Sequence, residues 1–217
     1  MADRVRIPKQ YNAFIADVRK RARKHGVKFL INKHQNFVEC GGIRSNGYFS
    51  DEDPITLAVG QGSRPLHQWF IILLHESCHM DQWIEQTDVW NNCTVGNGEW
   101  DTTAVIDLWI NNIVELNIAQ RNDYIKRSFE VELDCEKRSA AAIEKWDLPI
   151  HVPQYIQKAN AYVTFYKIIQ KSRKWYKIGK EPYHIRKIWK QMPTKFVEWK
   201  TPVPKRIRDL YEETLRK

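Results

Sequence analysis

The chain has 217 residues, of which 42% are hydrophobic and 28% charged, the balance of a folded globular protein and not of a disordered one. A formal net charge of +9 favours nucleic acid, anionic lipid or other acidic polymers as neighbours, although the same charge can serve solubility alone. The longest strongly apolar run, Trp69–Leu74, is far too short to cross a bilayer, and four cysteines without a Cys-x-x-Cys pair exclude a zinc ribbon and a disulfide-rich scaffold.

The N-terminal part predicts one amphipathic helix and a small sheet. The helix covers residues 7–26, with Pro8 near its start and Gly26 near its end. Its buried stripe consists of Tyr11, Phe14, Ile15 and Val18. Two strands are predicted, at residues 27–31 and 55–59. The first residues lack the apolar core of a signal peptide, so we expect a soluble protein of a reducing compartment.

The remainder predicts helices. Pro65 opens one over Leu66–Glu85, and a loop with two glycines follows at residues 91–100. The next helix covers residues 102–118, with inward-facing Ile106, Ile110, Ile113 and Leu116. Further helices are expected in residues 128–146, 154–170, 181–193 and 204–217. The fold class is therefore α+β, a small N-terminal sheet with a mostly helical remainder.

The segment LLHESCHMDQW contains the spacing His-Glu-x-x-His at His75, Glu76 and His79. Residues four apart lie on one face of a helix, so the two imidazoles can occupy two corners of a tetrahedral zinc site. Glu76 lies beside that face, where it can take a proton from a water that zinc has made acidic. The preceding run of apolar residues predicts a buried helix, in which unpartnered polar groups are costly. The alternative is a set of buried histidines satisfied by hydrogen bonds.

A catalytic zinc needs a third protein ligand. The later segment ELDCEKRSAAAI places Glu132 and Glu136 on one helical face that continues into alanines. We interpret Glu132 as the third ligand and Glu136 as a carboxylate that accepts a hydrogen bond from a ligand histidine. The swapped assignment stays open. Glu130 and Asp134 form a rival pair, which fits an exposed acidic face better.

These two segments, HESCH and ELDCEKRS, resemble the zincin metallopeptidases whose third ligand is a glutamate, the gluzincins. Within them the chain is most similar to small uncharacterised metallopeptidases of bacteriophages and bacteria. The resemblance covers mainly residues 69–143. The chain departs from the family pattern at Asp81, where an apolar residue is usual, and at Glu136, where an aspartate is usual.

The resemblance implies one zincin-like domain over residues 1–217, with a small sheet over the motif helix, one Zn²⁺ per chain and a peptide or protein substrate. Its parts would be residues 1–64, the metal-site helices at 65–147 and a helical part at 148–217. It also implies a cytoplasmic location, in the host if a phage encodes the chain. Zincins bind peptide along the edge of a strand, and residues 55–59 are our candidate for that edge. It is about as good an interpretation that residues 55–59 form an ordinary core strand.

A tyrosine often assists the oxyanion in zincins, and Tyr162 and Tyr166 are the candidates, with His151 behind them. Core packing is the competing role for both tyrosines. Cys78 and Cys135 lie inside the two motifs and are expected to pack, thiolate ligation being the alternative.

Two other functions compete with a peptidase. One is a non-catalytic protein of the same fold, in which zinc is structural. The other is a DNA-associated protease, because basic and aromatic residues alternate in the C-terminal third, at residues 173–177, 185–190 and 197–200. The competing explanation of that pattern is a helix with a basic exterior and an aromatic interior.

Overall fold

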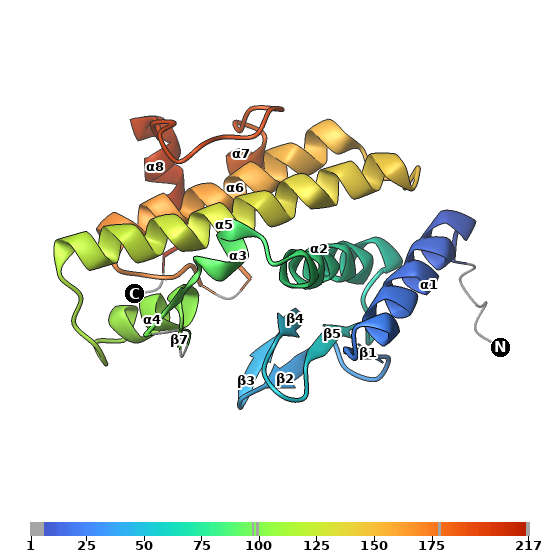
Figure 1. Cartoon of the computed structure of the whole chain (residues 1–217). Coiled ribbons are helices and arrows are strands. Elements are labelled where there is room, and N and C mark those ends of the chain that lie inside the picture. Colours follow the sequence, from blue (N-terminus) through green and yellow to red (C-terminus); the bar gives the residue numbers. More distant parts are fainter. Residues whose placement is uncertain (1–6, 97, 99, 178, 216–217) are drawn as a thin grey trace. The chain divides into compact units, whose positions relative to one another are not determined.

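The computed structural model describes residues 7–96, 98, 100–177 and 179–215, in an α+β fold that agrees with the expected class (Figure 1). The chain divides into two compact units. The first contains the residues up to 86 together with 141–149, and the second contains 87–140 and the residues from 150 onward. The long helix α5, Ile118–Lys145, contributes its final residues to the first unit.

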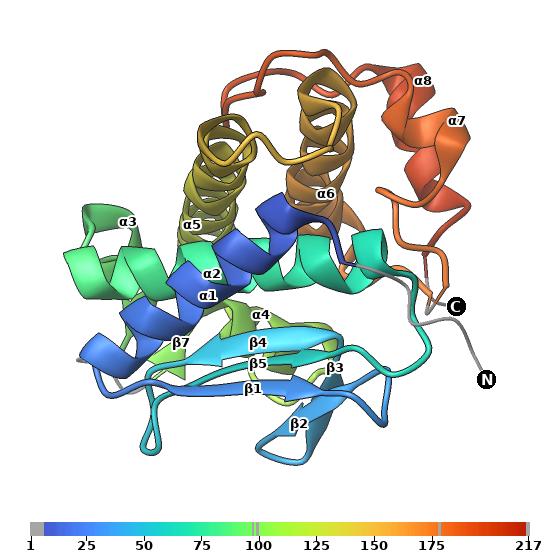
Figure 2. The ribbon, with the colours of Figure 1, turned by 90° about the vertical axis from the view of Figure 1, so that its right-hand side faces the viewer.

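The first unit is built on a three-stranded sheet with the order β1-β5-β4 (Figure 2). The strands are β1 (Lys28–Asn32), β4 (Gly47–Ser50) and β5 (Thr56–Gly60). β1 runs parallel to β5, with Ile31 opposite Val59, and β4 runs antiparallel to β5, with Tyr48 opposite Ala58. Every residue of the central strand β5 is buried. A separate hairpin pairs β2 (Val38–Cys40) with β3 (Ile43–Ser45).

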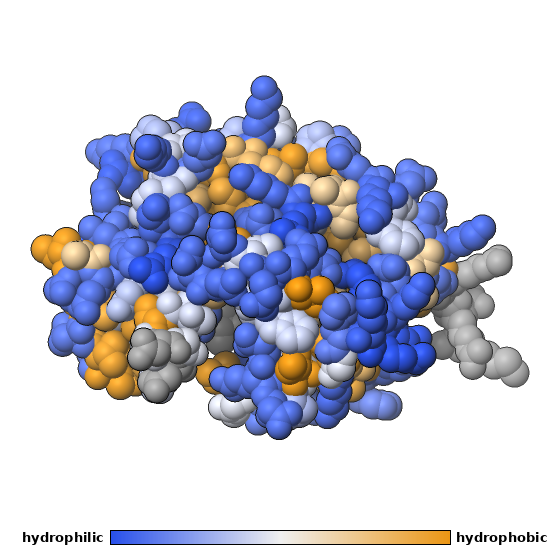
Figure 3. Space-filling model, viewed as in Figure 1, coloured by the Kyte–Doolittle hydropathy of each residue, from blue (hydrophilic) through white to orange (hydrophobic). Residues whose placement is uncertain are grey.

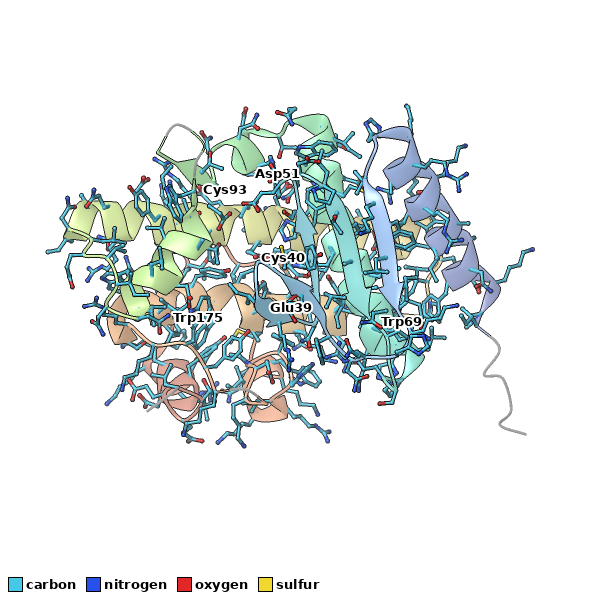
Figure 4. The ribbon with its side chains drawn as sticks, turned by 90° about the horizontal axis from the view of Figure 1, so that it is seen from below. Glu39, Cys40, Asp51, Trp69, Cys93 and Trp175 are labelled. Carbon is cyan, nitrogen blue, oxygen red and sulfur yellow. The ribbon has the colours of Figure 1, made fainter. Side chains whose placement is uncertain are left out.

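Two helices complete the first unit. α1 (Lys9–Lys24) buries the predicted stripe together with Ala22, and α2 (Leu66–Glu85) coincides with the predicted motif helix. α2 packs on β4 and β5. Tyr11 and Phe14 of α1 both contact Phe70 of α2, with ring centroids 4.0 and 5.4 Å apart. Figure 4 labels Trp69 near the start of α2, and Glu39 and Cys40 on β2. The buried aromatic and aliphatic side chains between these helices hold the motif helix in place.

The structure decides between the two interpretations of residues 55–59. β5 is hydrogen-bonded to a strand on each side, so it is the core strand and not the substrate-binding edge. The continuous apolar run of β5 is what a strand buried on both faces requires. Among the described residues of this sheet, β1 and β4 are the outer strands.

The second unit is mainly helical. Its helices are α3 (Asp88–Asn91), α4 (Thr102–Ile110), most of α5, α6 (Val152–Ser172), α7 (Arg186–Trp189) and α8 (Lys205–Glu212). A short hairpin of β6 (Thr94–Val95) and β7 (Trp100–Asp101) lies in the segment expected to be a plain loop. Figure 2 shows α7 and α8 beside α6. The core of the second unit includes the buried side chains Ile106, Ile125, Phe129, Phe165, Tyr166 and Tyr211.

The predicted helix over residues 102–118 is too long. α4 ends at Ile110, Asn112 adopts a left-handed conformation with φ of 60°, and α5 begins at Ile118. Because the chain leaves the helix here, Ile113 is 67% exposed and not inward-facing as expected, whereas Ile106 is fully buried. Asparagine tolerates the left-handed region better than most residues, which explains the break at the Asn-Asn pair.

Hydrophilic residues make up most of the face of the molecule in Figure 3. No helix in the described part of the chain combines the length and apolar character needed to cross a membrane.

Candidate metal centre

The His-Glu-x-x-His segment lies in the middle of α2, as predicted. The Nε2 atoms of His75 and His79 are 3.2 Å apart, and their rings are nearly perpendicular at 84°. Zinc–imidazole bonds of about 2.0–2.1 Å in tetrahedral geometry place two ligand nitrogens roughly 3.3 Å apart. The spacing of the two nitrogens therefore suits a shared metal ion.

Gln82 orients one of these histidines. Its side chain is completely buried, and its Oε1 lies 2.7 Å from Nδ1 of His79. An amide oxygen only accepts hydrogen bonds, so Nδ1 carries the proton and Nε2 keeps the lone pair that a metal requires. We did not predict this residue from the sequence. The signal was a polar residue one helical turn after a proposed ligand, inside an otherwise apolar helix.

Glu76 lies on the side of α2 that approaches β4. A β-carbon added to Gly47 of β4 would come within 2.5 Å of Ile72 Cγ2 and 3.1 Å of Glu76 Cγ. The strand therefore passes so close to the helix that a larger residue would collide with Ile72. Two residues on, Phe49 contacts Trp83 with ring centroids 5.8 Å apart, as expected from the two-residue period of a strand. An outer strand thus runs directly beside the proposed base.

Asp81, which departs from the family pattern, has a local explanation. Its carboxylate is paired with Arg21 of α1, and Arg21 also donates to Asp17 at 2.8 Å. The side chains of Arg21 and Asp81 are only 26% and 28% exposed. A charge at this position therefore joins α1 to the motif helix, a contact that an apolar residue could not make.

In the second unit, α5 presents the two predicted carboxylates. Glu136 is 7% exposed and accepts a hydrogen bond of 2.5 Å from the hydroxyl of Tyr155 in α6. Glu132 is half-buried, and its Oε1 lies 3.5 Å from the hydroxyl of Tyr166. The expectation that these glutamates avoid full solvation is confirmed. The rival pair is partly exposed, and both of its members are ion-paired, Glu130 with Lys126 at 3.5 Å and Asp134 with Arg138 at 2.6 Å.

Burial and the nearby glutamates keep the tyrosine hydroxyls around Glu132 and Glu136 protonated. Burial raises the pKa of Tyr162 and Tyr166, and the negative charge of Glu132 raises both further. Burial and the neighbouring Glu136 likewise raise the pKa of Tyr155. Each tyrosine therefore remains a hydrogen-bond donor beside a carboxylate. Burial also raises the pKa of Asp101, with Glu132 contributing.

Both candidate tyrosines also pack. Tyr166 is 1% exposed and belongs to the core of the second unit, while Tyr162 is half-buried against it. His151 is exposed and caps α6 by accepting from the backbone of Gln154. At 1.5 Å per residue it lies about 16 Å along the helix from Tyr162, so His151, the lower-ranked candidate, stands apart from the two tyrosines. Cys78 and Cys135 are both buried, an environment that suits packing and thiolate ligation alike.

The donor set fits a zinc ion by its chemistry. Two imidazoles face each other on α2, one of them held in the tautomer that can bind a metal, and the same helix carries Glu76, a carboxylate suited to proton transfer. No protein-family model, no curated protein and no solved structure matches the chain.

Proposed function

We propose that the chain is a zinc-dependent peptidase, with His75, His79 and Glu132 as ligands of one zinc ion and Glu76 as general base. The observation that carries the proposal is the pair of Nε2 atoms 3.2 Å apart, with His79 oriented by Gln82. Glu132 is proposed from its place in the second motif. It lies one helical turn before Glu136, on a face of α5 that is shielded from solvent.

When bound, zinc would acidify a water molecule and polarise the scissile carbonyl. Glu76 takes a proton from the attacking water and delivers it to the leaving amine. Gln82 holds the His79 ring against rotation through its bond to Nδ1. The hydroxyl of Tyr166 stays protonated, and in the resting enzyme it donates a hydrogen bond to Glu132. Tyr162 is the second candidate for assisting the oxyanion. Glu136 is proposed as the carboxylate that supports a ligand histidine.

The strand beside the motif gives a route for substrate binding. β4 lies at the outer side of its sheet and passes next to Glu76 at Gly47. An extended peptide can add to such an edge through backbone hydrogen bonds, which orient any sequence in the same way. In this proposal β4 replaces β5 as the peptide-binding strand.

The first test is zinc content by elemental mass spectrometry on protein purified without chelator. We expect about one zinc per chain in the wild type. His79→Ala and Glu132→Ala should lower the content strongly, whereas Glu130→Ala, on the ion-paired side of α5, should not. Cys135→Ser should retain zinc, which separates carboxylate from thiolate ligation. Absence of zinc from the wild type after reconstitution would refute the proposal.

The second test separates catalysis from structural zinc. Glu76→Gln should retain the metal and lower the cleavage rate of a quenched fluorescent peptide library by roughly 10²–10⁴-fold. A wild type that binds zinc, cleaves no library member and unfolds when zinc is removed would instead support the non-catalytic alternative.

A further inference from the structure

The charge of the chain is concentrated in its C-terminal part. Residues 150–217 contain 17 Lys and Arg against 5 Asp and Glu, a net charge of +12. The preceding 149 residues contain 18 against 21, a net charge of −3. The excess positive charge of the whole chain therefore belongs to one segment of the second unit, whereas solubility alone would not require such a concentration.

Two tryptophans of this segment make packing contacts in the second unit. Trp175 stacks on Phe165, with centroids 6.0 Å apart, and its Nε1 donates to Asp107 at 2.9 Å. Trp199 packs on Phe129, with centroids 5.2 Å apart. The alternation of basic and aromatic residues therefore mainly reflects an aromatic interior and a basic exterior.

Trp189 also packs partly against the core of the second unit, but it lines an open hollow of about 500 Å³. The hollow lies between the start of α6 and α7, and its lining is His151, Gln154, Gln157, Arg186, Trp189 and Lys190. This lining contains two cations, two amide groups and an indole, and no carboxylate. The ammonium group of Lys158 lies 5.6 Å from the centre of the Trp189 ring and adds a third positive charge beside it.

A second hollow, of about 530 Å³, lies at the other end of α6, where α8 begins. It is lined by the cations Lys171, Lys174, Lys205 and Arg208, together with Asp209 and Glu212. From Gln154 to Lys171 the two hollows are separated by roughly 25 Å along the helix. Several phosphates of an extended strand could contact cations over that distance.

We propose that the C-terminal part of the second unit binds single-stranded nucleic acid, with a base on Trp189 and phosphates on Arg186 and Lys190. Cationic side chains beside an aromatic ring on which a base can stack are how proteins hold single strands. Charge alone is enough to attract an anionic membrane, whereas the indole of Trp189 in the lining offers a surface on which a base can stack. The proposal does not depend on the metal site.

The test is fluorescence anisotropy of the protein as purified, without chelator, with labelled dT20, which offers no peptide bond to the proposed peptidase site. If about four phosphates are contacted, affinity should fall roughly 50-fold between 50 and 200 mM salt. Arg186→Ala with Lys190→Ala should weaken binding and reduce the salt slope by about 1.4. Arg23→Ala with Lys24→Ala removes the same charge from two exposed positions of α1 and should change neither quantity.

Trp189→Leu tests the stacking contact separately and should lower the affinity about tenfold while leaving the salt slope unchanged. The proposal is overturned if the wild type fails to bind dT20 at 50 mM salt, or if the two double variants behave alike. It is also overturned if the protein binds vesicles containing phosphatidylserine and not the oligonucleotide.

Discussion

The carboxamide oxygen of Gln82 lies 2.7 Å from Nδ1 of His79, and this contact decides the tautomer of a proposed zinc ligand. Without a metal, His75 can donate through its Nε2 hydrogen to the lone pair on Nε2 of His79, 3.2 Å away. With a metal, both nitrogens become ligands at nearly the same separation. The site therefore needs little rearrangement to bind an ion.

Replacing Gln82 should affect metal binding before it affects the fold. Gln82→Ala removes the acceptor and is expected to weaken zinc affinity about 10–100-fold. Gln82→Glu keeps an acceptor at the same place and should bind zinc at least as well as the wild type. The measurement is competition with a chromophoric chelator.

Gln68→Ala is the matched control, because Gln68 lies on the same helix and is exposed. An equal loss of zinc in this variant and in Gln82→Ala would show that Gln82 has no specific role at the metal.

Gly47 should tolerate no side chain. Gly47→Ala brings a methyl group within 2.5 Å of Ile72 Cγ2 and is expected to cost about 1–3 kcal/mol of unfolding free energy, measured in urea. Ile72→Ala removes the colliding atom, so the glycine substitution should cost clearly less on that background. Additive effects of the two substitutions would contradict the close approach of β4 to α2. Because Glu76 Cγ is also near, the glycine variant should lose peptidase activity beyond its loss of stability.

The pair of Arg21 and Asp81 should couple α1 to the motif helix. A double-mutant cycle with Arg21→Ala and Asp81→Ala is expected to give a coupling of roughly 0.5–1 kcal/mol at low salt, near the upper end for partly exposed pairs. High salt should reduce the coupling, because both side chains are reached by solvent. A coupling energy of zero at low salt would mean that the carboxylate at position 81 serves another purpose.

Asn160 should be the strongest polar contributor to the C-terminal part. It is fully buried in α6, donates to the carbonyls of Pro193 and Lys195, and accepts from the backbone of Val197. Asn160→Ala leaves these groups without their partner and should cost about 2–4 kcal/mol.

Asn160→Asp should not rescue the loss, because a carboxylate would face two carbonyl oxygens. Asn12 provides the control, since it is exposed and its replacement by alanine should change stability by less than about 0.5 kcal/mol. Thermal unfolding of the three variants checks these expectations. Comparable melting temperatures for Asn160→Ala and Asn12→Ala would show that the segment after α7 does not depend on this side chain.

The sequence alone determined the elements whose signals are local. Pro65 and the apolar run after it were enough to predict α2 from Leu66 to Glu85, and the spacing of His75 and His79 was enough to place two imidazoles together. Helical geometry acts over three or four residues, so such relationships can be read from a single segment. The shielded face of α5 followed from the same rule.

Only the tertiary structure decided relationships between distant segments. It showed that β5 is a central strand and β4 an outer one, because strand order depends on hydrogen bonds between residues far apart in sequence. It gave Asp81 its partner on α1, and it showed that Trp189 lines a hollow while it packs, like Trp175 and Trp199, against the core of the second unit. The three tryptophans lie in similar basic and aromatic segments, so the sequence pattern cannot tell how exposed each one is. The exposure of each depends on which other elements pack over it.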